Sequence, residues 1–132
     1  MKRTGLALLA LLWSAPAFAA CPAGQGEMLT VRLYFGQSMN GRAIAAAAWR
    51  DFLTRTVTPR FASGFTVYDA QGQWRDPATR AVTREASKVI EAVAPDTRAL
   101  RTGIEAIRRN YVARFHQQSV GMTTFAVCGT FQ

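Results

Sequence analysis

Apolar and polar side chains alternate along the segment from Met28 to Gly36. One set of alternate positions is apolar: Leu29, Val31, Leu33 and Phe35. The positions between them hold Thr30, Arg32 and Tyr34. A period of two residues over this length predicts a half-buried β-strand. We expect the apolar set to face the core and the other set to lie on a more exposed face.

Two later segments repeat their apolar residues at the spacing of an α-helix. From Arg42 to about Thr56, a run of alanines with high helix propensity is followed by apolar positions at helical spacing. Pro59 is expected to end this helix, because the residue before a proline is pushed out of the α region. The second helix is expected to follow a turn and N-cap at 95–97. Its apolar positions are Leu100, Ile104, Ile107, Tyr111 and Phe115.

Three more short segments, rich in β-forming residues, predict strands at Phe65–Ala70, Ser87–Ala94 and Ser119–Cys128. Between the first two, residues 73–84 are rich in Pro, Thr and Arg and are expected to form an extended hairpin tip or loop. The order strand–helix–strand–strand–helix–strand predicts an α+β fold of the ferredoxin-like type, with two helices on one face of a four-stranded antiparallel sheet. This fold hosts many unrelated functions, so function has to be argued from the residues.

The first nineteen residues have the pattern of a secretory signal peptide. Lys2 and Arg3 precede an apolar run from Leu6 to Trp13, and Ala17-Phe18-Ala19 forms an A-x-A cleavage site. The run is shorter than the roughly 20 residues that span a bilayer, and no later segment qualifies. We therefore expect a signal peptide at 1–19, one domain at 20–132, and a periplasmic or secreted protein.

The two cysteines, Cys21 and Cys128, allow two interpretations. An even number of cysteines in a small exported domain predicts a disulfide, and a ferredoxin-like sheet brings the end of its last strand beside the start of its first. Alternatively, Ala19-Ala20-Cys21 has the small residues of a lipoprotein signal, which would anchor the protein to a membrane through Cys21. The disulfide is favoured because Phe18 stands where such signals usually carry Leu, and because lipidation leaves Cys128 unpaired.

The chain is basic, with 16 Lys and Arg against 8 Asp and Glu. Removing Lys2 and Arg3 with the leader leaves 14 cations, of which Lys88 is the only lysine. Because the cations are scattered, we interpret them as solvated surface charge and expect no nucleic-acid partner for an exported protein. An anionic small ligand, cell-wall polymer or membrane surface remains compatible with this charge.

Motifs of catalysis and metal binding are missing from the sequence. There is one histidine, His116, and no H-x-x-H, C-x-x-C or paired-acid cluster, so no metal site or cofactor is expected. No nucleophile elbow, Cys–His pair or phosphate loop is present either. His116 is expected to be an exposed side chain near the end of the second helix, where its charge favours the helix dipole.

A polar and aromatic set remains as candidate ligand-binding residues: Arg60, Trp74, Arg84, Glu85, Ser87, Lys88 and Gln118. A group of Arg, Lys and Glu beside a tryptophan is suited to holding a carboxylate or a sugar. The alternative interpretation is structural and carries more weight. In it, Glu85 forms an ion pair with Arg60 or Lys88 that ties the hairpin to a helix end, and Trp74 covers the edge of the core.

The exposed side of the sheet is the second candidate, with Arg32, Tyr34, Tyr68 and Val89 expected to point away from the helices. Such a face is typical of a dimer interface or a ligand platform. The preferred hypothesis is therefore a non-catalytic exported binding or interaction domain that forms a homodimer through this face. The alternative is a small enzyme of the dimeric α+β barrel type that acts on an anionic small molecule. Its pocket would be lined by Arg32, Tyr34, Tyr68 and Lys88.

Several short motifs spread over the chain resemble a known family. They include Tyr34-Phe35-Gly36, Val57-Thr58-Pro59-Arg60-Phe61, Gly72-Gln73-Trp74-Arg75, Ser87-Lys88-Val89 and Gln118-Ser119-Val120. Together they resemble a family of small exported bacterial proteins known only as a domain of unknown function, over nearly the whole chain after the leader. The segment 41–44 departs from the polar capping residues that this family often has there. The resemblance implies no activity, substrate or cofactor.

Overall fold

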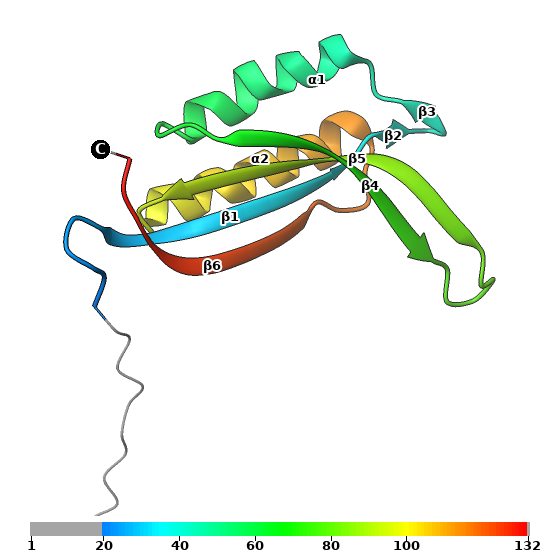
Figure 1. Ribbon diagram of the computed structural model, residues 1–132. Coiled ribbons are helices and arrows are strands. Elements are labelled where there is room, and N and C mark those ends of the chain that lie inside the picture. The colour runs from blue at the N-terminus through cyan, green and yellow to red at the C-terminus, as the bar shows by residue number, and fades with distance from the viewer. Residues whose placement is uncertain (1–19, 132) are drawn as a thin grey trace, which may run out of the picture.

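The computed structural model describes residues 20–131, so the expected signal peptide at 1–19 lies outside the described residues. Its centre is an antiparallel sheet of four strands in the order β4-β5-β1-β6 (Figure 1). The strands are β1 (Gly26–Gly36), β4 (Thr66–Arg75), β5 (Val82–Ala94) and β6 (Gly121–Gly129). The main helices are α1 (Ala46–Phe52) and α2 (Arg98–Phe115). This strand order and connection are those of the ferredoxin-like fold, so the predicted fold class is confirmed.

The alternation of β1 separates two faces of the sheet as predicted. Leu29, Val31, Leu33 and Phe35 are all buried. The Phe35 ring lies 5.5 Å from the ring of Trp49 in α1 and 4.7 Å from that of Tyr111 in α2. Since both helices contact the same side chain of the sheet, both cover the same face. The core lies between them and this face.

The first helix differs from its prediction at both ends. It begins at Ala46 because residues 38–43 form a small hairpin of β2 (Ser38–Met39) and β3 (Arg42–Ala43). At its other end the helical backbone continues past Phe52 through a π-turn (Leu53–Val57) and a 3₁₀ turn (Thr58–Arg60). Pro59 therefore does not end the helical segment. A proline is tolerated in the first turn of a 3₁₀ helix, where its missing N–H is not needed.

The hairpin of β4 and β5 is longer than expected from its composition. Residues 73–84 were expected to form an extended hairpin tip or loop, and they form a hairpin whose strands pair as far as Arg75 and Val82. The turn is held by Asp76, whose carboxylate accepts hydrogen bonds from the backbone N–H of Ala78 at 2.8 Å and of Thr79 at 2.7 Å. This arm extends beyond the rest of the sheet (Figure 1). Backbone pairing alone sustains it, so its sequence lacks the apolar alternation of a covered strand.

The second helix follows its predicted periodicity. Its five buried residues are Leu100, Ile104, Ile107, Tyr111 and Phe115. Thr97 is the N-cap, and its hydroxyl accepts a hydrogen bond from the Leu100 N–H at 3.1 Å. His116 is exposed and ends the helix in a left-handed conformation with φ 51°.

A disulfide joins Cys21 and Cys128, with 5.5 Å between their Cα atoms. The β1–β6 register sets Glu27 opposite Cys128, so the start of the first strand lies beside the end of the last. The predicted pairing is confirmed. It uses the Cys21 sulfur that lipid attachment would require, so the lipoprotein alternative conflicts with the structure. Within residues 20–131, no helix has the length and hydropathy needed to cross a membrane.

Candidate functional site

The sheet surface turned away from the helices is called the open face below. The β1 register sets Tyr34 opposite Val89, and Arg32 opposite Glu91. Tyr68 of β4 also pairs with Val89, so these residues share one face as predicted. Strand β6 adds Phe125, which pairs with Thr30 of β1. Three aromatic side chains in the central part of this face are partly exposed: Tyr34 at 38%, Tyr68 at 47% and Phe125 at 48%.

Polar groups on the open face are paired with one another. Arg32 forms an ion pair with Glu91, and this hydrogen bond and the adjacent negative charge raise the pKa of Arg32 above its usual value. The Tyr68 hydroxyl reaches the same carboxylate at 3.5 Å. The guanidinium of Arg32 also lies 5.7 Å from the centre of the Phe125 ring, a cation–π arrangement. These contacts fix the side chains across β4, β5, β1 and β6.

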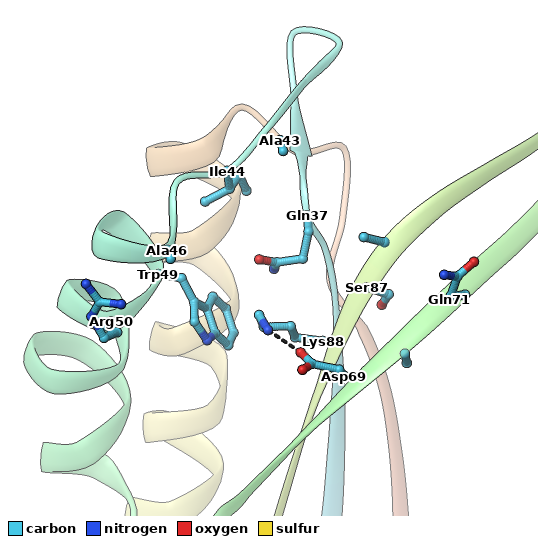
Figure 2. A pocket seen from close by; sticks show the side chains of 12 residues that line it. Gln37, Ala43, Ile44, Ala46, Trp49, Arg50, Asp69, Gln71, Ser87 and Lys88 are labelled. Carbon is cyan, nitrogen blue, oxygen red and sulfur yellow. Dashed lines mark hydrogen bonds and ion pairs between the residues drawn. The ribbon is translucent and has the colours of Figure 1, made fainter.

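A cavity of about 810 Å³ lies at the opposite side of the same strands and is called the helix-side pocket (Figure 2). It is bounded by α1, by the β2–β3 hairpin and by the adjoining part of β4 and β5. Apolar contributions come from Ile44, Ala46 and Trp49. Its polar side chains are Gln37, Arg50, Asp69, Gln71, Ser87 and Lys88. Lys88 lies here because it pairs with the buried Phe35 and therefore points to the helix side of β5.

One lining residue of the helix-side pocket, Gln37, belongs to a buried hydrogen-bond chain. The Gln37 Nε2 donates to the Tyr111 hydroxyl oxygen at 2.9 Å, and the Tyr111 hydroxyl donates to the Gly36 carbonyl at 2.6 Å. Burial raises the pKa of the Tyr111 phenol above its usual value, the Gln37 hydrogen bond opposes this shift, and the Glu85 charge adds to it. Tyr111 therefore stays neutral and keeps the proton that it donates. The chain holds the Gln37 side chain in one orientation.

Cationic groups of the pocket have unequal surroundings. The Lys88 ammonium forms an ion pair with Asp69, whose side chain is 86% exposed. Arg50 is exposed, and no acidic side chain within residues 20–131 pairs with its guanidinium. The neighbouring acid, Asp51, is already bound by Arg55 at 2.6 Å and by Arg114 at 2.9 Å. Arg50 is therefore the available cation at the pocket.

The candidate ligand residues from the sequence do not meet in one site. Arg60 lies at the far end of α1, where its Nη1 donates to the Thr56 carbonyl at 2.6 Å. Trp74 lies on the β4–β5 arm with 52% of its surface exposed, so it does not cover the core edge. Gln118 is exposed and borders a separate shallow hollow beside α2.

Neither predicted ion pair of Glu85 forms. Lys88 takes Asp69 as its partner because the two are opposite each other in the β4–β5 register. Glu85 instead lies near the end of β1, where its Oε1 stands 3.2 Å from the position that a Cβ on Gly36 would take. Arg84 is exposed on the arm, and the Ser87 hydroxyl donates to the Phe35 carbonyl at 3.2 Å.

The residues proposed for an α+β barrel pocket are also divided between the two faces. Arg32, Tyr34 and Tyr68 lie on the open face, whereas Lys88 lines the helix-side pocket. The physical reason is strand alternation, because Lys88 directly precedes Val89 and must point the other way. Within residues 20–131, no group of three or more His, Cys, Asp or Glu side chains is placed to hold a metal ion.

Sequence reasoning missed the main residues of the helix-side pocket: Gln37, Trp49, Arg50 and Asp69. Trp49 lies within the helix predicted from Arg42 to about Thr56, where its apolar side chain was expected to serve the core. Gln37 lies between the predicted strand that ends at Gly36 and the predicted helix that begins at Arg42, and Asp69 lies near the end of the strand predicted at Phe65–Ala70. The one usable signal was that successive side chains of a strand point to opposite faces, which places Lys88 and Val89 of β5 on different sides of the sheet.

Comparison with solved structures supports the fold. A phage SAM lyase in complex with S-methyl-5'-thioadenosine is similar with a TM-score of 0.58 and 10% identity, over 80% of this chain and 92% of that chain. A phage SAM lyase in the apo state is similar with a TM-score of 0.55 and 13% identity, over 96% and 99% of the two chains. At such identities the likeness concerns the fold alone.

Sequence comparison identifies the family. No curated protein sequence matches this chain. A family model described as "Protein of unknown function (DUF3574)" matches residues 30–131, which is most of the chain. The resemblance found in the short motifs is thereby confirmed, and this chain belongs to the DUF3574 family of proteins of unknown function.

Proposed function

We propose that this protein is an exported, non-catalytic interaction domain that forms a homodimer through its open face. The observation that carries the proposal is the charge arrangement of that face. Arg32 and Glu91 lie opposite each other near the middle of that face, and their charges neutralise each other. Two copies of a strongly basic chain repel each other, so a neutral face is where they can approach most closely.

The side chains of the open face are also of the types that interfaces favour. Tyrosine and phenylalanine are enriched at the centres of protein–protein contacts, and Tyr34, Tyr68 and Phe125 are each partly exposed. A paired, neutral network suits a contact surface better than proton transfer. An isologous two-fold contact uses the same surface on both copies and is the commonest arrangement of soluble dimers.

Support for export comes from the leader sequence and from the Cys21–Cys128 disulfide. Disulfides persist in oxidising compartments such as the periplasm and the extracellular space. The proposed location is therefore periplasmic or secreted.

Light scattering on residues 20–132 at micromolar concentration tests the dimer. The expected result is twice the monomer mass. Tyr68→Arg puts two cations into a two-fold interface, so this variant is expected to scatter as a monomer with an unchanged circular dichroism spectrum. Val82→Arg is the matched control, because it changes an apolar residue of similar exposure on the other side of the β4–β5 arm, and it should remain dimeric. A monomeric wild type, or a Tyr68→Arg variant that stays dimeric, overturns the proposal.

A further inference from the structure

We infer that the helix-side pocket binds a small organic anion, namely a carboxylate that also carries an N–H donor and a flat apolar group. The pocket lies on the opposite side of the sheet from the proposed dimer contact, so the two proposals stand or fall separately. Its volume of about 810 Å³ lies in the range of small-molecule sites. That space accommodates a ligand of the size of an acylated amino acid or a dipeptide.

Charge at the pocket selects an anion. Arg50 and Lys88 contribute two positive charges and Asp69 one negative charge, which leaves one positive charge in excess. The Lys88 ammonium already holds a carboxylate, that of Asp69, and this shows which group the site accepts. Because the Asp69 side chain is 86% exposed, it is loosely enclosed and exchangeable for the carboxylate of a ligand. The unpaired Arg50 guanidinium supplies further donors for the same group.

The requirement for an N–H donor comes from Gln37. This residue is 8% exposed, and its Nε2 is committed to the Tyr111 hydroxyl and, at 3.4 Å, to the Phe35 carbonyl. Its Oε1 therefore faces the other way, and within residues 20–131 no protein donor is bonded to it. In Figure 2 the oxygen of this amide lies on the side of α1, above Lys88. This oxygen is open to the pocket although its side chain is otherwise buried, and an N–H group of the ligand would satisfy it.

The apolar lining of the pocket favours a flat apolar group in the ligand. Trp49 borders the pocket beside Ile44 and Ala46, and Figure 2 shows its indole between Arg50 and Lys88. An aromatic ring or planar amide of the ligand packs against this surface. The cationic, hydrogen-bonding and apolar features thus lie within one cavity.

Hippurate, which is N-benzoylglycine, has a carboxylate, an amide N–H and a planar ring, and it serves as the probe. Trp74→Phe leaves Trp49 as the single tryptophan of residues 20–132, so binding can be followed by its fluorescence. A saturable change with a dissociation constant of about 1 mM or tighter is expected. Hippuramide lacks the charge and is expected to bind roughly tenfold or more weakly, and N-methylhippurate, which lacks the N–H, several-fold more weakly.

Arg50→Gln tests the protein side of the same contact. This variant is expected to weaken hippurate binding roughly tenfold, because it removes a charge-assisted hydrogen bond. Arg98→Gln is the matched control, since Arg98 is an exposed arginine at the start of α2 and outside this pocket, and it should bind as the parent does. Lack of a saturable change up to about 10 mM hippurate, or equal weakening by the two variants, overturns the inference.

Discussion

The open face and the helix-side pocket lie on opposite sides of β4 and β5, and they differ in how their polar groups are paired. On the open face, Arg32 and Glu91 are paired with each other across neighbouring strands. At the pocket, Arg50 has no acidic partner and the carbonyl oxygen of Gln37 has no bonded donor among the described residues. A neutral surface whose polar groups are already hydrogen-bonded suits contact with another protein surface. Polar groups without a protein partner around a cavity suit a small ligand that forms hydrogen bonds with them.

The largest expected loss of stability tests whether adjacent residues of β1 lie on different faces of the sheet. Phe35→Ala removes a fully buried ring at the centre of the aromatic cluster and is expected to lower the free energy of unfolding by about 3–5 kcal/mol. Tyr34→Ala, one residue earlier and 38% exposed, is expected to cost the monomer about 1 kcal/mol or less. Urea denaturation at low protein concentration measures both. Equal losses would show that the two faces are not distinct.

Removal of the disulfide is expected to lower the stability of the fold without changing ligand binding. Cys21 and Cys128 lie beside Met28 and Pro95, in a hollow distinct from the helix-side pocket. Replacing both with serine is expected to lower the free energy of unfolding by about 2–4 kcal/mol, since it frees a long loop in the unfolded chain. The dissociation constant of hippurate should stay that of the parent. Denaturation curves and fluorescence titrations test both expectations, and an unchanged midpoint of unfolding contradicts the first.

Sequence patterns predicted the fold well because the fold depends on local periodicity. The two-residue period of β1 and the helical spacing of α2 each arise within one segment, and both are visible without knowledge of the neighbours. The β2–β3 hairpin and the strand pairing within the arm at 71–82 were missed, because short or uncovered strands need no apolar alternation. Their residues are instead positioned by backbone pairing.

The candidate site could not be predicted in the same way, because it is assembled from distant segments. Gln37, Arg50, Asp69 and Lys88 come from a loop, a helix and two strands. The predicted pairing of Lys88 with Glu85 was reasonable from their distance along the chain. It was wrong because the register sets Asp69 opposite Lys88, and register depends on the length of the whole hairpin.

Tyr111→Phe is expected to affect the pocket and leave the open face unchanged. The substitution removes a hydroxyl that donates to the Gly36 carbonyl and accepts from Gln37, and leaves both without these partners. The expected loss is about 1–3 kcal/mol in the free energy of unfolding, which urea denaturation measures. Hippurate binding should weaken because the Gln37 amide is no longer held. Light scattering should still give the dimer mass, and a monomer would mean that the two regions are coupled.

The smallest effect concerns Asp51, whose pairing leaves its neighbour Arg50 free. Hydrogen bonds from Arg114 and Arg55 lower the pKa of Asp51 below its usual value of 3.8. Because the folded pKa is lowered, the carboxylate stabilises the fold above the ordinary pKa, and this contribution disappears as the pH falls through the folded value. Asp51→Asn should therefore reduce the melting temperature at pH 7 by a few degrees at most, as expected for an exposed ion pair.

The melting temperatures of Asp51→Asn and wild type, measured from pH 7 to pH 2, should begin to converge as the pH falls below about 3.8, and should coincide once the pH is below the lowered pKa of the folded carboxyl. The variant also tests the comparison of the two regions. Asp51 joins α1 to Arg114 of α2 on the outer side of the helices. Its loss frees Arg55 and Arg114 and leaves Arg50 as it was, so hippurate binding at pH 7 should be unchanged. A strong gain or loss of binding would mean that Arg50 shares Asp51 in solution, and that the pocket lacks an available cation.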